Sequence, residues 1–130
     1  MSEDVQQISL FRFYDVLQAR VPSIAYAFHT PNGGVRARQT AARLKAMGTR
    51  MGVPDVLIPV KSPDGRYNGL AIELKYGKNK PTAAQMAWIQ FLHTQDWSAY
   101  VVYDWTHAAA LTCQYFGIAP DEYGLSIYME

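Results

Sequence analysis

The sequence predicts an α/β domain in which helices flank a mixed β-sheet. Apolar residues recur at helical spacing in some segments and form short β-branched or aromatic runs in others, in the order helix, strand, helix, strand, strand, helix, strand, helix. Of the 130 residues, 49% are hydrophobic and 18% are charged, an ordinary balance for one compact globular domain. Because no internal repeat, low-complexity tract or linker interrupts the pattern, we expect residues 1–130 to form a single domain.

The first two predicted elements are a helix and a strand. The helix has an apolar face with a spacing of mostly three and four residues, formed by Ile8, Leu10, Phe11, Tyr14, Leu17 and Val21. Ser2 can cap this helix, and Pro22 follows its end. Residues 24–28 are aromatic and compatible with a strand, and the Thr-Pro-Asn-Gly-Gly run at 30–34 predicts a turn or loop.

A second helix and two strands follow. Residues 36–47 place Ala37, Ala41 and Leu44 on one helical face, and Gly48 ends the helix. Strands are predicted at residues 55–60 and 70–75, with a turn between them at residues 62–65.

The last part of the chain predicts a helix, a strand and a final helix, at residues 82–93, 98–103 and 106–116. Thr82 and Gln85 form a capping box at the start of the first of these helices. That helix is expected to pack against a sheet through Met86, Ile89 and either Trp88 or Leu92. Gly117 ends the final helix, and the acidic tail from residue 119 shows no motif.

The cysteine content and the amino terminus bear on location. Cys113 is the only cysteine, so it cannot form an intramolecular disulfide, and it suits a reducing compartment. Residues 1–4 lack the basic start and apolar stretch of a secretory signal, and no apolar run approaches the ~20 residues needed to span a bilayer. We therefore expect a soluble intracellular protein.

Charge is distributed unevenly along the chain. All 12 Lys and Arg residues lie in positions 1–80, which carry a net six positive charges, whereas positions 81–130 hold five acids and no base. Residues 16–54 contain no acid and six bases: Arg20, Arg36, Arg38, Arg43, Lys45 and Arg50. Such segregation is typical of a polyanion-binding face if the fold gathers these residues on one side. A solvated helix surface with scattered bases explains the charge alone equally well.

Two acids and a lysine stand at the borders of the central apolar runs. Asp55 opens the first run, and 18 residues later the second run ends in Glu73, Leu74 and Lys75. Strand alternation puts Glu73 and Lys75 on one face, while Leu74 points into the opposite core and offers its backbone carbonyl. Mg²⁺ prefers hard oxygen ligands and keeps several waters, so one or two carboxylates and a carbonyl are sufficient. These residues predict a divalent-metal site with a positive charge beside it, which suits phosphodiester hydrolysis.

A structural explanation exists for the same residues. Asp55 can cap a turn, and Glu73 with Lys75 can form a solvated strand edge, because Glu and Lys alternate on many exposed strands. Two features favour the chemical interpretation. Both acids lie in otherwise apolar runs, and the basic segment Gly-Lys-Asn-Lys-Pro follows at residues 77–81.

This arrangement, with further motifs along the chain, resembles the PD-(D/E)xK nuclease superfamily. More narrowly, it resembles the virus-type replication-repair nuclease (VRR-NUC) domain in the small stand-alone form common in phages and prophages. The motifs that carry the resemblance are Glu3 with Gln7, His-Thr-Pro-Asn-Gly-Gly at 29–34, Arg-Leu-Lys-Ala-Met-Gly at 43–48, Gly-Val-Pro-Asp at 52–55, Gly-Leu-Ala-Ile-Glu-Leu-Lys at 69–75, and Gln85. They are specific as a set and cover residues 3 to about 116.

The resemblance implies a restriction-endonuclease-like core, Mg²⁺ or Mn²⁺ dependence, and cleavage of structured DNA such as Holliday junctions or flaps in replication, recombination or repair. By position, Asp55 and Glu73 would be metal ligands, Lys75 the catalytic lysine and Gln85 the motif glutamine near the site. Glu3 would be an accessory acid that approaches the metal or orients its water. Homodimers are frequent among stand-alone members, and the setting would be the cytoplasm of a bacterial or phage-infected host cell.

Several motif residues have two explanations. Gln85 can complete the capping box, act in the site, or do both. His29 is either a structural loop residue or a phosphate contact. A phosphate could also meet backbone N–H groups of Asn32, Gly33 and Gly34, although the turn alone accounts for these residues. We expect core or dimer contacts for Trp88, Trp97 and Trp105.

Two main classes of function follow. The first is a metal-dependent endonuclease that reads branched or flapped DNA through phosphate contacts from Arg36, Arg38, Arg43, Lys45 and Lys78. The second is a non-catalytic nucleic-acid-binding module with the same basic face. Intact Asp55, Glu73 and Lys75 favour the enzyme, because a decayed site would be free to lose any of them. An RNA-directed enzyme is a third alternative, and no recognition-helix or zinc-finger pattern indicates base-edge readout.

Overall fold

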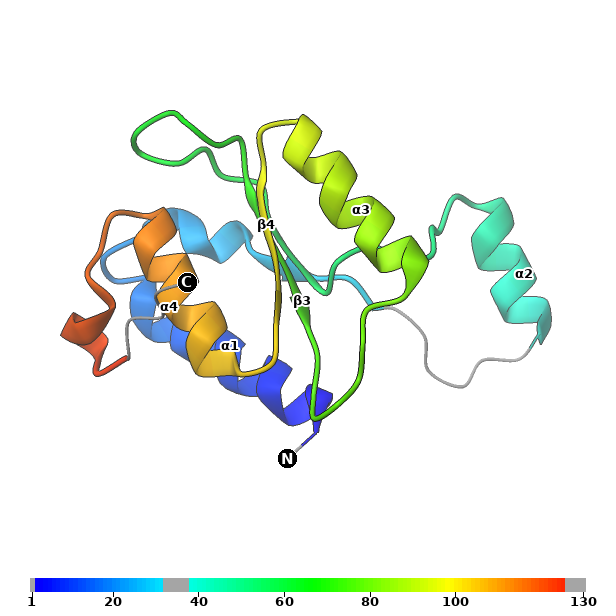
Figure 1. Ribbon diagram of the computed structural model, residues 1–130, viewed down its shortest axis with the longest axis horizontal. Coiled ribbons are helices and arrows are strands. Elements are labelled where there is room, and N and C mark those ends of the chain that lie inside the picture. The colour runs from blue at the N-terminus through cyan, green and yellow to red at the C-terminus, as the bar shows by residue number, and fades with distance from the viewer. Residues whose placement is uncertain (1, 32–37, 126–130) are drawn as a thin grey trace.

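The computed structural model describes residues 2–31 and 38–125 (Figure 1). Helices and strands occur in the predicted α/β order, together with two short 3-10 helices, η1 and η2. The elements are α1 (Glu3–Leu17), η1 (Pro22–Tyr26), β1 (Phe28–His29), α2 (Arg38–Ala46), β2 (Val56–Ile58), β3 (Leu70–Leu74), α3 (Ala83–Thr94), β4 (Ser98–Val102), α4 (Trp105–Tyr115) and η2 (Pro120–Tyr123).

The strands form one mixed sheet in the order β1-β2-β3-β4. β1 and β3 both pair antiparallel with β2, and Val56 lies opposite Ile72. β3 pairs parallel with β4, and helix α3 makes the crossover that a parallel connection requires. The predicted mixed sheet flanked by helices is therefore confirmed.

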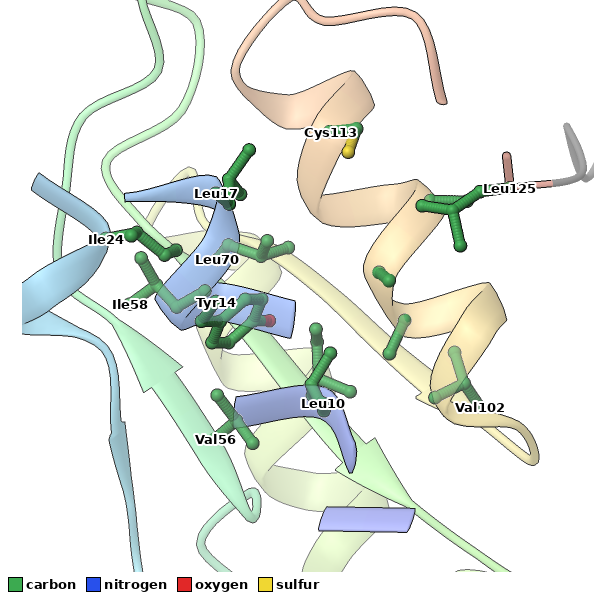
Figure 2. Packing of buried hydrophobic residues seen from close by; sticks show 14 of the residues in the cluster. Leu10, Tyr14, Leu17, Ile24, Val56, Ile58, Leu70, Val102, Cys113 and Leu125 are labelled. Atoms are coloured by element: carbon green, nitrogen blue, oxygen red, sulfur yellow. The ribbon is translucent and has the colours of Figure 1, made fainter. Parts of the chain in front are cut away.

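Two apolar cores lie on opposite faces of the sheet. Helices α1 and α4 cover one face, and the larger core beneath them is shown in Figure 2; its buried members include Leu10, Tyr14, Leu17, Val56, Ile58, Leu70, Val102 and Cys113. Helix α3 covers the other face (Figure 1), and a smaller core forms there from Ala71, Ile89, Leu92 and Ala99. Strand β3 lies between the two cores and is buried at every position.

The predicted helix caps at Ser2 and Thr82 are confirmed. The Ser2 hydroxyl oxygen accepts a hydrogen bond from the Val5 N–H at 3.2 Å. At α3 the capping box is reciprocal: the Gln85 N–H donates to the Thr82 hydroxyl at 3.1 Å, and the Thr82 N–H donates to the Gln85 side-chain oxygen at 2.8 Å. Both helix starts are therefore fixed by local side chains that the sequence reveals.

One part of the predicted α1 face is wrong. Ile8 is exposed, whereas the polar Gln6 is buried. The Gln6 side-chain oxygen accepts a hydrogen bond from the Trp105 N–H at 2.7 Å, so it satisfies a backbone donor at the start of α4. Apolar periodicity does not detect a buried glutamine that serves another helix.

The predicted strand at residues 24–28 is confirmed at Phe28 and wrong at residues 24–27. Pro22 begins the 3-10 helix η1, and the Ile24 N–H donates to the Val21 carbonyl at 3.0 Å. Ile24 is buried in the larger core, so the chain turns over the end of α1 before it reaches the sheet. Within residues 2–31, Phe28 and His29 are the residues that pair with β2.

Helix α2 stands away from the rest of the molecule (Figure 1). Within residues 40–51, which we call the α2 arm, Leu44 alone is half-buried and every other residue is exposed. Arg43 and Lys45 lie in the last helical turn, where basic side chains complement the negative end of the helix dipole. No helix in the described part of the chain is long and apolar enough to cross a membrane.

Candidate metal-binding active site

Asp55 lies where β2 begins, beside the end of β3 that carries Glu73. The two strands are antiparallel, and the Asp55 carboxylate Oδ2 accepts a hydrogen bond from the Leu74 N–H at 2.8 Å. The structure therefore brings together Asp55, Glu73 and Leu74, which the sequence analysis assigned to one site.

Glu73 and Lys75 project on the α3 side of the sheet, as alternation predicts. Only 2% of Glu73 and 8% of Lys75 is exposed, and the Lys75 Nζ lies 3.5 Å from the Glu73 Oε2. The Gln85 Nε2 donates to the same carboxylate oxygen at 3.2 Å. The other oxygen, Oε1, is buried and has no hydrogen-bond partner among the described residues.

The electrostatic environment of Glu73 opposes its ionisation. Removal from water is the main cause that raises the pKa of Glu73 to about 8 from an ordinary value of 4.5, and the negative charge of Asp55 raises it further. The Lys75 ammonium acts in the opposite direction but does not offset these effects. A second positive charge at this position would favour the ionised carboxylate.

Gln85 completes the predicted capping box and also contacts Glu73. Its side-chain oxygen completes the capping box with Thr82, and its side-chain nitrogen holds the Glu73 carboxylate. The two ends of one amide thus connect the beginning of α3 to the centre of the site.

His29 and Thr30 fasten the backbone at Asp55. The Asp55 carbonyl accepts the Thr30 N–H at 2.8 Å and lies 2.9 Å from the His29 Nδ1, which donates when it carries the proton. The Thr30 hydroxyl donates to the Pro54 carbonyl at 2.6 Å. His29 therefore lies beside the site and has a structural contact there.

Glu3 and Gln7 lie on the first turns of α1, whose start approaches the loop after β3. The Glu3 Oε2 accepts a hydrogen bond from the Asn79 Nδ2 at 3.0 Å. The Gln7 Nε2 is buried without a hydrogen-bond partner in the described part of the chain. Within residues 2–31 and 38–125, no group of three or more His, Cys, Asp or Glu side chains is placed to hold a metal, so Glu3 does not complete such a cluster there.

The predicted DNA contacts are only partly described. Arg43 and Lys45 are exposed on the α2 arm, and Lys78 is exposed in the loop that follows β3. Arg38 is the first residue of α2. Four predicted residues lie outside the described ranges: Asn32, Gly33, Gly34 and Arg36.

Sequence reasoning assigned no site role to Thr30, Gly52, Asn79 or Trp88. Thr30 and Gly52 lie in the motifs at residues 29–34 and 52–55, so their places in the sequence indicated a role near Asp55. Asn79 lies in the basic loop, where it binds Glu3. The Trp88 indole N–H donates to the Met51 carbonyl at 3.0 Å, four residues before Asp55, and nothing in the sequence pattern indicated that contact.

Comparison with known proteins agrees with this fold. The family model of the VRR-NUC domain matches residues 4–105. A solved structure of a VRR-NUC domain protein is similar with a TM-score of 0.73 and 27% sequence identity, over 92% of this chain and 91% of that one. Fold and match together define a nuclease-type DNA-processing module. The chain belongs to the VRR-NUC family, as the sequence motifs indicated. Among curated proteins, none matches the sequence.

Proposed function

We propose that this protein is a Mg²⁺- or Mn²⁺-dependent endonuclease that hydrolyses phosphodiester bonds in structured DNA of the Holliday-junction or flap type. The observation that carries the proposal is the buried Glu73 carboxylate. One of its oxygens is held by Lys75 and Gln85, while the other has no hydrogen-bond partner among the described residues. Membership of a nuclease family supports the same reaction class.

The donor set suits a hard divalent cation. A buried polar oxygen without a partner costs about 1–3 kcal/mol, so an arrangement that keeps one suits the binding of a cation. The carboxylates of Asp55 and Glu73, with the Leu74 carbonyl, would hold the cation, because Mg²⁺ and Mn²⁺ prefer oxygen ligands of this kind. When bound, the cation supplies positive charge that offsets the charge developing on the phosphoryl oxygens.

The chain's own residues have separable tasks in this proposal. Lys75 holds a fixed ammonium next to Glu73, within reach of a phosphoryl oxygen or an attacking water. Gln85 orients the Glu73 carboxylate, and the contacts of His29 and Thr30 hold the Asp55 backbone. Because Glu73 and Lys75 are almost fully buried, these groups are fixed before the substrate arrives.

The exposed basic side chains of the α2 arm, together with Lys78, would bind the phosphates of the DNA. A homodimer would present two active sites to the two strands of a symmetric junction, which a single small domain cannot do. The proposed preference for a symmetric junction follows from the two active sites of the homodimer, and the basic side chains of the α2 arm would supply phosphate contacts.

Cleavage of a substrate panel tests the proposed function. Labelled linear duplex, single-stranded, 5′-flap and four-way-junction DNA, with an RNA duplex beside them, would be incubated with Mg²⁺, Mn²⁺ or EDTA. We expect cleavage of branched DNA that requires a metal and is lost in Glu73→Gln, because the amide cannot supply the second carboxylate. Binding without cleavage under every condition would favour the non-catalytic module, and cutting of RNA alone would favour the RNA-directed enzyme.

The α2 arm should contribute to affinity rather than to the chemical step. Arg43→Ala with Lys45→Ala is expected to weaken DNA binding and to reduce the slope of log K against log salt by about 2, since each lost phosphate contact removes about 1. Cleavage at saturating DNA should be retained. Lys61→Ala with Arg66→Ala removes the same charge from the β2–β3 loop, at the far end of these strands from Glu73, and is the matched control. An equal loss of slope in both double variants would exclude a special role of the arm.

A further inference from the structure

The segment before Asp55 is docked directly on helix α3. The Trp88 indole N–H donates to the Met51 carbonyl at 3.0 Å. The next residue, Gly52, is buried with φ +84°, a conformation that favours glycine. A Cβ added at Gly52 would lie 2.7 Å from the Ala84 carbonyl carbon and 2.8 Å from the Ala84 Cβ. The close approach to α3 therefore requires glycine for two independent reasons.

The same segment is fixed to the sheet on its other side. Pro54 is fully buried, and its carbonyl accepts the Thr30 hydroxyl at 2.6 Å. The Asp55 carbonyl accepts the Thr30 N–H, and the Asp55 carboxylate accepts the Leu74 N–H at 2.8 Å. Residues 51–55 are thus held between the beginning of helix α3 on one side and Thr30 and strand β3 on the other.

Helix α3 also carries the amide that holds Glu73. Ala84 and Gln85 are adjacent in the first turn, and Trp88 follows one turn later. A helix transmits the position of one turn to the next with little change, since its backbone hydrogen bonds are internal. Docking Gly52 against Ala84 therefore sets where Asp55 lies relative to Gln85, and through Gln85 relative to Glu73.

We propose that Gly52 and Trp88 are positioning residues that set the separation of Asp55 from the Glu73 and Gln85 pair. The consequence for cation binding rests on the proposed function, whereas the geometric part does not. Residues that orient metal ligands typically change metal affinity or activity 10- to 100-fold when they are replaced. Misplacement of a reacting group by ~1 Å lowers the reaction rate by a similar factor.

Trp88→Phe is the main test because it removes the indole N–H and keeps an aromatic ring on the outer side of the smaller core. The matched control is Trp97→Phe. Trp97 packs against the same smaller core but contacts Gly69, which precedes β3 at the end away from Glu73. Both variants lose the same atoms from the same side-chain type, so any general loss of packing should be comparable.

Two measurements separate positioning from a merely structural role. The first is amide NMR of the metal-free protein, in which the Leu74 N–H and the Gln85 side-chain amide report on Asp55 and Glu73. We expect Trp88→Phe to shift both signals and to speed exchange of the Leu74 amide, and Trp97→Phe to leave them in place. The second is titration with Mn²⁺, for which Trp88→Phe should weaken binding by about tenfold or more while Trp97→Phe does not.

Gly52→Ala is expected to change the NMR signals and Mn²⁺ affinity in the same direction with a larger effect. If Gly52→Ala does not fold, Trp88→Phe alone tests the proposal. The proposal is overturned if Trp88→Phe leaves the Leu74 and Gln85 signals unchanged, or if Trp97→Phe shifts them equally. Wild-type protein that neither binds Mn²⁺ nor cleaves DNA would refute the proposed function instead. The NMR comparison would still decide whether Gly52 and Trp88 position Asp55.

Discussion

Lys75→Met is expected to lower metal-dependent DNA cleavage by at least about 10²-fold at saturating substrate, because removal of one preorganised charged or donor group typically has that effect. The ammonium is 3.5 Å from the Glu73 Oε2 in a nearly closed environment, where charge is poorly screened. Methionine has a similar length without the charge. DNA affinity should change little, since Lys75 is buried and the exposed basic side chains lie on the α2 arm and at Lys78.

Lys78→Met provides the control for that experiment. Lys78 is exposed three residues further along, so its loss should weaken DNA binding and leave the rate at saturating DNA close to wild type. Circular dichroism in the presence of metal would verify that both variants are folded. Full cleavage by Lys75→Met would remove this lysine from the mechanism.

Glu73→Gln is expected to stabilise the metal-free protein at alkaline pH and to have little effect near pH 4. The pKa of Glu73 is about 8 in the folded protein, above its ordinary value of 4.5, so the folded state holds the proton more tightly than the unfolded state. Glu73 therefore favours folding at low pH, and this contribution is lost as pH rises from about 4.5 to about 8. Glutamine, which resembles the protonated acid, does not undergo this loss.

Thermal unfolding in EDTA between pH 4 and pH 9 measures this effect. The Tm of Glu73→Gln should exceed that of the wild type at pH 9 by on the order of 10 °C, and the difference should shrink toward pH 4. Asp15→Asn removes one exposed carboxylate from α1 and should show no such trend. Saturating Mg²⁺ should narrow the gap at pH 9 by stabilising the wild type. A gap that is independent of pH would show that Glu73 is not held in its neutral form.

Local patterns in the sequence were enough to predict how the β3 part of the candidate site is arranged. Glu73 and Lys75 share a face because strand side chains alternate, and the capping box of Thr82 with Gln85 depends on four consecutive residues. The meeting of Asp55 with β3 also followed once two adjacent strands were predicted. These features need only short-range geometry.

The features that the sequence did not predict depend on tertiary distances. A glycine at position 52 is visible in the sequence, but its approach to Ala84 exists only after α3 has packed on the sheet. Gln6 is buried because it binds the Trp105 N–H at the start of α4. Ile24 is not in a strand because it packs into the larger core. In each case a contact between distant segments outweighed the local pattern.

The complete burial of β3 has a consequence for how this chain can change over evolutionary time. A strand covered on both faces is normally occupied by Val, Ile and Leu, yet β3 contains the ionisable Glu73 and is followed directly by Lys75. An apolar replacement of Glu73 alone would leave the buried Lys75 ammonium without its partner, whereas apolar replacement of Glu73 and Lys75 together would be neutral or stabilising. In a lineage that had no need of the site, the two residues would therefore be expected to disappear together. The joint occurrence of Glu73 and Lys75 in related sequences would therefore report on selection at this position of the fold.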